Sequence, residues 1–264
     1  SIEAGEIDSE AAYKVSEYLT KLMIQAGLDE SSEGDGLKEM IAKSLQLSVS
    51  NGYHKALPNY ARLFLFGWYF DEDFKAFDTY MRMAAQKDLI EGIAYIGEYA
   101  LIGDTKEKKQ EGLKYLKIAA DRNHMESTYK LGRVYLDGEL VRKDYKKGMS
   151  YIEFAHQNKN NEATKYLCNA YVFEDEQNLN EAIDICQKNA ANGDMMNQLA
   201  LSWAYSNSND VVKCYAWSSI GLSKASSEKH ESFKEQFRAL KDICYQSMTQ
   251  SQIKRANDLI KKLK

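Results

Sequence analysis

The four cysteines are the residues whose type and spacing come closest to a recognisable chemistry. Cys168, Cys186, Cys214 and Cys244 all lie in the C-terminal part of the chain, and their spacings match no zinc pattern such as paired CxxC. The first two lie about equally far on either side of a predicted turn at 175–178, and the last two stand in a similar relation to a turn at 225–228. Because an antiparallel hairpin brings such positions to a similar height, two disulfides would form in an oxidising compartment. The alternative is a set of buried free thiols that replace small residues at helix contacts.

The other reactive side chains indicate no catalysis. The four histidines stand alone in the sequence, and no GxSxG, HExxH, phosphate-loop or GxGxxG motif occurs; the histidines are His54, His124, His156 and His230. Acidic runs at 71–73 and 174–176 fall in predicted turns, and a calcium site would need about six oxygen ligands in one loop. We interpret these runs as solvated charges of turns and helix N-termini. The sequence therefore predicts a protein that is not an enzyme, with no cofactor and no metal.

Composition limits the fold and the partner. The 264 residues include one proline, with 44% apolar and 28% charged residues and a net charge of −4. Scarce helix breakers favour an all-α chain, and the net charge argues against a general nucleic-acid binder. The longest unbroken apolar run, residues 63–70, is too short to span a bilayer.

An internal repeat specifies the architecture. Its clearest copy is Ser127-x-x-x-Leu131-Gly132-x-x-Tyr135-x-x-Gly138, and the same frame starts at residues 56, 92, 127, 163 and 197. A second pattern of apolar and small residues spaced 3, 4, 7 and 8 apart follows each frame. Each repeat therefore predicts helix A, a turn and helix B. Gly132 and Gly148 would let two helices approach closely, while the aromatic residues at position eight of helix A fill the wedge between repeats: Phe64, Tyr135, Tyr171 and Tyr205.

These motifs resemble the Sel1-like repeat family, a relative of the tetratricopeptide repeats. The resemblance rests on the 127–138 frame, on Lys143-Asp144-x-x-Lys147-Gly148 and on Ala190-Ala191-Asn192-Gly193, and it covers residues 56–222. It implies a right-handed α-solenoid that binds another protein. The family includes immunity proteins against secreted lipases, so the resemblance points to an inhibitor of a secreted toxin such as a lipase. The alternative is an envelope assembly or host-interaction scaffold.

Three domains follow from the repeat. Residues 1–55 form an N-terminal helical cap, residues 56–222 form five repeats, and residues 223–264 form C-terminal capping helices, with about twelve main helices in all. The first cap comprises helices at 8–26 and 37–50, and the last comprises helices at 229–247 and 250–263. Thr249-x-x-Gln252 predicts a capping box. The predicted apolar face of the first helix is Ala11, Val15, Tyr18, Leu19, Leu22 and Met23.

The binding surface is expected on the concave face, by analogy with tetratricopeptide geometry. Positions two and six of each frame would line it, and the partner-binding residues predicted there are Arg62, Glu98, Tyr129, Arg133, Lys165, Asn169 and Trp203. Truncating the strongest of them, with Trp203 as an apolar anchor, should change folding little. The competing expectations are an ordinary solvated surface or binding by the acidic turns at 71–73 and 174–176. The chain begins without Met, and we expect a periplasmic or secreted protein whose signal has been removed, with a cytoplasmic location as the alternative.

Overall fold

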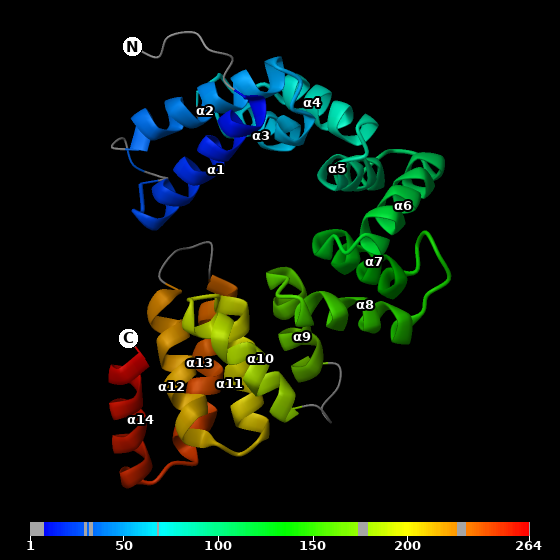
Figure 1. Ribbon diagram of the computed structural model, residues 1–264. Coiled ribbons are helices and arrows are strands. Elements are labelled where there is room, and N and C mark those ends of the chain that lie inside the picture. Colours follow the sequence, from blue (N-terminus) through cyan, green and yellow to red (C-terminus); the bar gives the residue numbers. More distant parts are fainter. Residues whose placement is uncertain are drawn as a thin grey trace. The chain divides into compact units, whose positions relative to one another are not determined.

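The computed structural model describes residues 8–28, 31, 34–67, 69–173, 179–225 and 231–263. Every regular element within these ranges is helical, so the all-α prediction is confirmed (Figure 1). The expectation of about twelve main helices is too low, because five two-helix repeats and a hairpin at each end require fourteen, and the described residues form fourteen α-helices.

The helices follow one another at short intervals along the chain. In order they are α1 Ser9–Gln25, α2 Asp35–Ser50, α3 Leu57–Phe66, α4 Phe74–Gln86, α5 Ile90–Leu101, α6 Lys106–Asp121, α7 Met125–Asp137, α8 Tyr145–Gln157, α9 Asn161–Phe173, α10 Leu179–Ala191, α11 Met195–Asn207, α12 Val211–Lys224, α13 Glu231–Gln246 and α14 Gln250–Leu263; one turn of 3₁₀ helix, His54–Ala56, precedes α3. The helices α3 to α12 are alternately the A and B helices of the five repeats.

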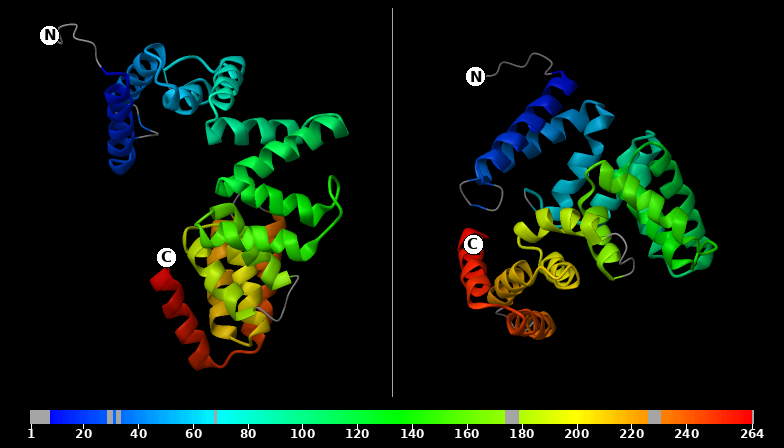
Figure 2. Two further views of the ribbon diagram at one scale, coloured as in Figure 1. Left: turned by 45° about the vertical axis from the view of Figure 1, so that its right-hand side comes forward. Right: turned by 90° about the horizontal axis from the view of Figure 1, so that it is seen from below.

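The chain divides into two compact units, residues 1–143 and 144–264. Within the first unit α1 packs on α2, α2 packs on α3, and each helix from α3 to α6 packs on the next one, as far as α7. In the second unit each helix from α8 to α12 packs on the next one, as far as α13, and α14 packs on α12 (Figure 2). The A helices α9 and α11 also contact each other. Contacts between neighbours in sequence are what a stack of helical repeats requires, because each repeat buries its apolar face on the next.

Acidic side chains in the turns cap the helices that follow them. Asp73 Oδ1 accepts a hydrogen bond from Ala76 N at 3.0 Å, and Asp144 Oδ1 accepts one from Lys147 N at 3.0 Å. A cap of this kind satisfies an N–H that has no partner within the helix. The run at 71–73 is thus explained as exposed turn residues and a helix cap, while the run at 174–176 lies outside the described residues.

Glycine permits close helix approach in the second repeat. A Cβ added to Gly112 on α6 would lie 2.7 Å from the carbonyl oxygen of Gly97 on α5. These two glycines occupy the same positions of their repeat as Gly132 and Gly148 do in the next one. The packing role predicted for small residues is therefore present at this pair of helices, where any larger residue would separate the backbones.

The first helix buries a face that only partly matches the predicted one, because Leu19 and Met23 are buried as predicted and the rest of the predicted face is exposed. The residues buried on α1 are Ala12, Ser16, Leu19 and Met23, whereas Val15, Tyr18 and Leu22 are exposed. The residues of each stripe are spaced three or four apart, and the two stripes are offset by one residue, so periodicity alone does not show which of them is buried. Ser16 is tolerated in the core because its hydroxyl donates to the carbonyl of Tyr13 at 2.6 Å, which satisfies the polar group on burial.

The C-terminal cap follows the prediction closely. Gln252 Oε1 accepts from Thr249 N at 2.8 Å, and Thr249 Oγ1 accepts from Gln252 N at 3.3 Å, so the predicted capping box is confirmed. On α13, Phe237 and Leu240 are buried against Leu199 of α11. The last hairpin therefore covers the apolar end of the fifth repeat.

Candidate protein-binding surfaces

A cavity opens between α1, α2 and α3 in the first unit. Its volume is about 270 Å³, and its floor consists of the aliphatic side chains Ile41, Leu45 and Leu63. The remaining lining residues are polar: Ser16, Glu17, Thr20, Lys21, Asn59 and Arg62. An apolar floor surrounded by a few polar groups is the usual form of a pocket that receives one apolar side chain or a small molecule.

Hydrogen bonds fix the polar rim of this cavity. Arg62 Nη1 donates to Asn59 Oδ1 at 3.0 Å, and Asn59 Nδ2 donates to the Tyr13 hydroxyl at 3.2 Å. Burial raises the pKa of Tyr13 to about 12, and the nearby negative charge of Glu17 contributes in the same direction. Arg62, predicted as a partner-binding residue, is thus held at the rim of the cavity, and its guanidinium has further N–H groups that can donate to a ligand.

The raised tyrosine pKa values predict a loss of stability in alkali. Burial also raises the pKa of Tyr60 in this unit to about 12. In the unfolded chain both phenols ionise near pH 10, so their contribution is fully present below pH 10 and is lost as the pH rises through 12. We expect the free energy of unfolding in urea to fall between pH 10 and 11, and to fall less in Tyr13→Phe. An equal decline in both proteins would contradict the assignment.

The other predicted residues of the first unit make polar contacts on α5 and α7. Glu98 Oε2 on α5 lies 2.6 Å from Lys130 Nζ on α7, so this carboxylate links two consecutive A helices. On α7, Arg133 Nη1 lies 3.4 Å from the Tyr129 hydroxyl. Arg133 Nη2 is 3.9 Å from Asp137. Glu98 is therefore a structural cross-link in this arrangement, and the Tyr129–Arg133 pair is a half-exposed polar element of α7.

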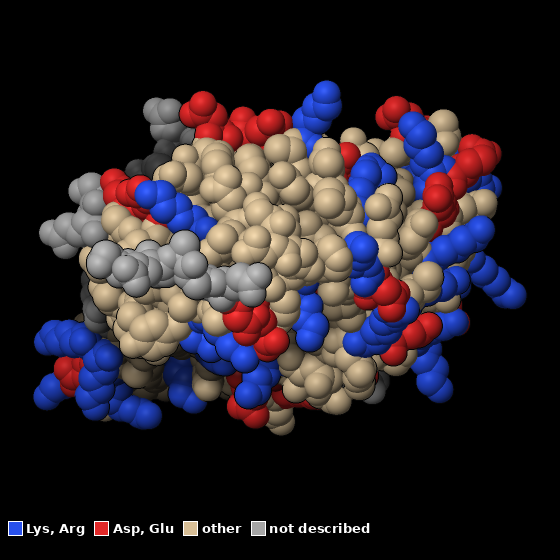
Figure 3. Space-filling model, turned by 45° about the horizontal axis from the view of Figure 1, so that its top comes forward, with Lys and Arg blue, Asp and Glu red and all other residues tan. Residues whose placement is uncertain are grey.

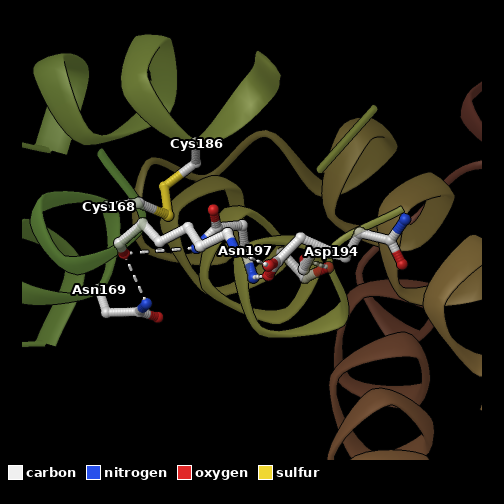
Figure 4. The surroundings of a disulfide bond; sticks show 8 residues. Cys168, Asn169, Cys186, Asp194 and Asn197 are labelled. Carbon is white, nitrogen blue, oxygen red and sulfur yellow. Dashed lines mark hydrogen bonds and ion pairs between the residues drawn. A yellow bond between two sulfur atoms is a disulfide. The ribbon is translucent and has the colours of Figure 1, made fainter. Parts of the chain in front are cut away.

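In the second unit two asparagines meet between the A helices α9 and α11. Asn169 Nδ2 donates to the carbonyl oxygen of Lys165 at 2.8 Å, and Asn197 Nδ2 donates to the same oxygen at 3.5 Å (Figure 4). The Oδ1 atoms of both asparagines are buried without a hydrogen-bond partner among the described residues. Lys165 Nζ lies 3.8 Å from Asp194 on the same face. The sequence identified Lys165 and Asn169, but it missed Asn197, which stands at the first position of its frame where a core residue is expected.

Trp203 is part of the protein core as well as of this face. It is half-buried and packs against the cluster formed by Leu199, Phe237 and Leu240. We therefore expect truncation of Trp203 to destabilise the fold, contrary to the prediction from the sequence, because the indole packs between α11 and α13. Of the seven predicted residues, Arg62, Glu98, Tyr129 and Arg133 belong to the first unit, and Lys165, Asn169 and Trp203 belong to the second. One continuous stripe across both stays a prediction.

The cysteines of the second unit form two disulfides. Cys168 on α9 is bonded to Cys186 on α10, with a Cα–Cα distance of 5.0 Å (Figure 4). Cys214 on α12 is bonded to Cys244 on α13, with a Cα–Cα distance of 6.2 Å. These are the pairs that the hairpin geometry predicts. All four residues are buried, so each bond ties a hairpin together from inside.

The histidines have structural surroundings. His124 Nδ1 accepts from Ser127 N at 3.3 Å and so caps α7, and His156 Nδ1 lies 2.9 Å from Thr164 Oγ1. His54 is exposed in the 3₁₀ turn, and His230 lies outside the described residues. Across the described ranges, no three of the residue types His, Cys, Asp and Glu gather as a metal site would require.

Charged side chains of both signs are distributed over the surface shown in Figure 3. On this face, basic and acidic side chains lie interspersed around an uncharged area. None of the helices in the described part of the chain is long and apolar enough to cross a membrane.

The helical hairpins, the repeat length and the contacts between neighbouring repeats together define an α-solenoid of Sel1-like repeats. Solved structures share this fold. A Sel1 repeat protein from Oxalobacter formigenes matches with a TM-score of 0.62 and 17% identity, covering 81% of this chain and 87% of its own. A protective antigen of uropathogenic Escherichia coli strains, described as having an SLR fold, matches with a TM-score of 0.57 and 16% identity. The match covers 97% of this chain and 61% of that protein.

An immunity protein is also similar in structure. Pa5087 from Pseudomonas aeruginosa matches with a TM-score of 0.52 and 18% identity over 92% of this chain and 83% of its own. At the level of sequence, neither the models of known families nor the curated proteins match the chain. At these identities the likeness establishes the fold, and the function is argued below from the chain's own residues.

Proposed function

We propose that this chain is a non-enzymatic protein-binding module that acts as a periplasmic immunity protein, binding and blocking a secreted toxin such as a lipase. The cavity between α1, α2 and α3 carries the proposal. Its aliphatic floor lies at the bottom of the cavity, and the basic side chains Lys21 and Arg62 stand on its rim together with Glu17. A partner that presents an apolar side chain next to a carboxylate would fill the floor and pair with these cations.

Two further observations support the proposal. The fold is shared with an immunity protein of Pseudomonas aeruginosa. The two disulfides suit a compartment such as the bacterial periplasm, where disulfides form and persist. An immunity protein against a toxin that acts in the envelope would have to bind it in the periplasm. The presence of disulfides therefore agrees with the proposed role.

The proposal predicts that a toxin gene neighbours this reading frame, and the test uses the toxin that it encodes. Cells that export both proteins to the periplasm should survive with the wild-type chain and lose protection when Lys21 and Arg62 are both changed to Ala. We expect the affinity of the purified pair, measured by calorimetry, to fall by about a hundredfold, because truncating two central anchors commonly removes several kcal/mol of binding free energy.

A matched control lies on the same helix as Lys21. Lys14 on α1 is exposed, pairs with Glu10 at 3.0 Å and does not line the cavity, so Lys14→Ala should retain both protection and affinity. Protection that survives the double substitution would place the toxin on another surface. Failure of the wild-type chain to bind the toxin at all would refute the immunity role.

A scaffold that contacts host or envelope proteins is the second candidate. It is favoured by the structural likeness to the protective antigen of Escherichia coli, which extends over 97% of this chain. The same cavity would then receive a segment of a host or envelope protein. Capture of such a protein by the wild-type chain and its loss in the Lys21 and Arg62 double variant, with no effect on any toxin, would select this function.

A further inference from the structure

A second cavity, of about 350 Å³, lies in the second unit between α8, α9 and α10. It is separate from the A-helix residues discussed above. All of its lining residues except Ile185 have polar or charged side chains, and three of these groups can carry positive charge; the residues are His156, Lys159, Asn161, Thr164, Asp184, Ile185, Lys188 and Asn189. Neither lysine has a carboxylate within ion-pairing distance among the described residues.

Lys159 has an unusual backbone conformation for a lysine. It occupies the left-handed region with φ of +67°, as do Asp88 and Asn123 in other turns that join consecutive repeats. Asp and Asn tolerate this region better than Lys because their short side chains hydrogen-bond locally. A lysine at such a position needs a reason other than the turn itself.

The corresponding turn of the first unit shows what the position can do. There the left-handed residue is Asp88, and its carboxylate lies 2.8 Å from Arg122 Nη1 at the end of the next helix B. In the second unit the same position carries Lys159, and the end of the next helix B adds Lys188 near it in the cavity lining. The turn at Asp88 is thus neutralised by an ion pair within the chain, whereas the turn at Lys159 has a second cation, Lys188, near it. An anion from outside would neutralise them.

A buried donor and a helix N-terminus complete the cavity. Asn189 is 8% exposed and lines the cavity, and its Nδ2 has no hydrogen-bond partner among the described residues. A buried donor left unsatisfied costs about 1–3 kcal/mol, so an acceptor is expected to reach it directly or through a water molecule. Asn161 and Thr164 belong to the first turn of α9, where the helix dipole favours an anion. Asn160 already accepts hydrogen bonds from Ala163 N and Thr164 N, so these two N–H groups are not among the donors.

We propose that this cavity binds a phosphate group, as the free ion or as the phosphate of a small ester. Two lysines, a histidine and the buried amide of Asn189 line one cavity beside the N-terminus of α9. These donors outnumber the two oxygens of a carboxylate and suit the oxygens of a tetrahedral oxyanion. Asp184 is the one acidic residue of the lining, and its charge opposes the ligand.

The experiment is calorimetric titration of the oxidised full-length chain with inorganic phosphate, with ionic strength held constant by sodium chloride. We expect one saturable site. Lys159→Asn should weaken binding by about tenfold, which corresponds to one charge-assisted hydrogen bond. Its melting temperature should not fall, because Asn fits the left-handed backbone. Asp184→Asn should strengthen binding about threefold by removing the opposing charge.

Lys117→Asn is the matched control, since Lys117 is an exposed lysine on the B helix α6 of the first unit and lines no described cavity. It should leave phosphate binding unchanged. Titration with glycerol 3-phosphate distinguishes the sources: tighter binding than inorganic phosphate identifies an ester, and weaker binding identifies the free ion. The proposal is overturned if no saturable binding occurs, if acetate binds as tightly as phosphate, or if Lys159→Asn binds as well as the wild type.

Discussion

Reduction of the two disulfides is expected to destabilise the second unit by several kilocalories per mole and to leave the first unit nearly unchanged. The bonds close loops whose ends are 18 and 30 residues apart. On chain-entropy grounds they contribute about 3 and about 4 kcal/mol by restricting the unfolded chain. All four cysteines lie in residues 144–264, so the first unit has no bond to lose.

Hydrogen exchange followed by mass spectrometry measures this difference helix by helix. With reductant, amides of α9, α10, α12 and α13 should exchange faster, while those of α1 to α6 keep their protection. Intact mass should rise by about 4 Da, because each bond takes up two hydrogen atoms. Four free thiols in protein purified from its native compartment would instead support the buried-thiol interpretation and count against a periplasmic protein. Equal loss of protection in both units would show that the units unfold together.

The repeat made most of the fold predictable. Because apolar and small residues recur at a fixed interval, the pattern marks which residues of each helix meet the next repeat. The helix predicted at 37–50 is observed at Asp35–Ser50, and the one predicted at 250–263 coincides with Gln250–Leu263. Tyr171 and Tyr205, assigned to the wedge, are both buried. The sequence does not reveal their hydroxyl partners, Glu153 and Gln187 of the preceding B helices, because these depend on how two repeats stack.

The cap helix and the cavity were harder to predict, and for one physical reason. Residues 1–55 contain no copy of the repeat, so nothing in the sequence states which face of α1 meets α2. The exposed stripe with Val15 and Tyr18 is more apolar than the buried one, which includes Ser16. Arg62 was found because it has a place in the frame, whereas Lys21 was missed because it has none. A site made jointly by a cap and a repeat is visible only once the two are packed together.

Gly92→Ala is expected to destabilise the first unit by about 2–3 kcal/mol, although the repeat pattern suggests the opposite. Gly92 stands at the start of its frame, where other copies carry Ala56 and Ala163, both buried. On α5, however, an added Cβ would lie 2.7 Å from Ala84 C and 2.8 Å from Met81 O, and closer still to the backbone nitrogen of Ala85. These atoms belong to the backbone of α4 and its last turn, so no side chain can rotate away and the helices must separate.

Gly36→Ala is the matched control for this substitution. Gly36 lies in the first turn of α2, is exposed and has no atom within 4 Å of an added Cβ. Here alanine should stabilise the chain by about 0.5 kcal/mol, because it restricts the unfolded chain and favours helix without a clash. Urea unfolding of the two variants therefore should give shifts of opposite sign. Equal shifts, or a gain in stability with Gly92→Ala, would show that α4 and α5 lie farther apart than described and that the alanine of the other repeats suits this contact too.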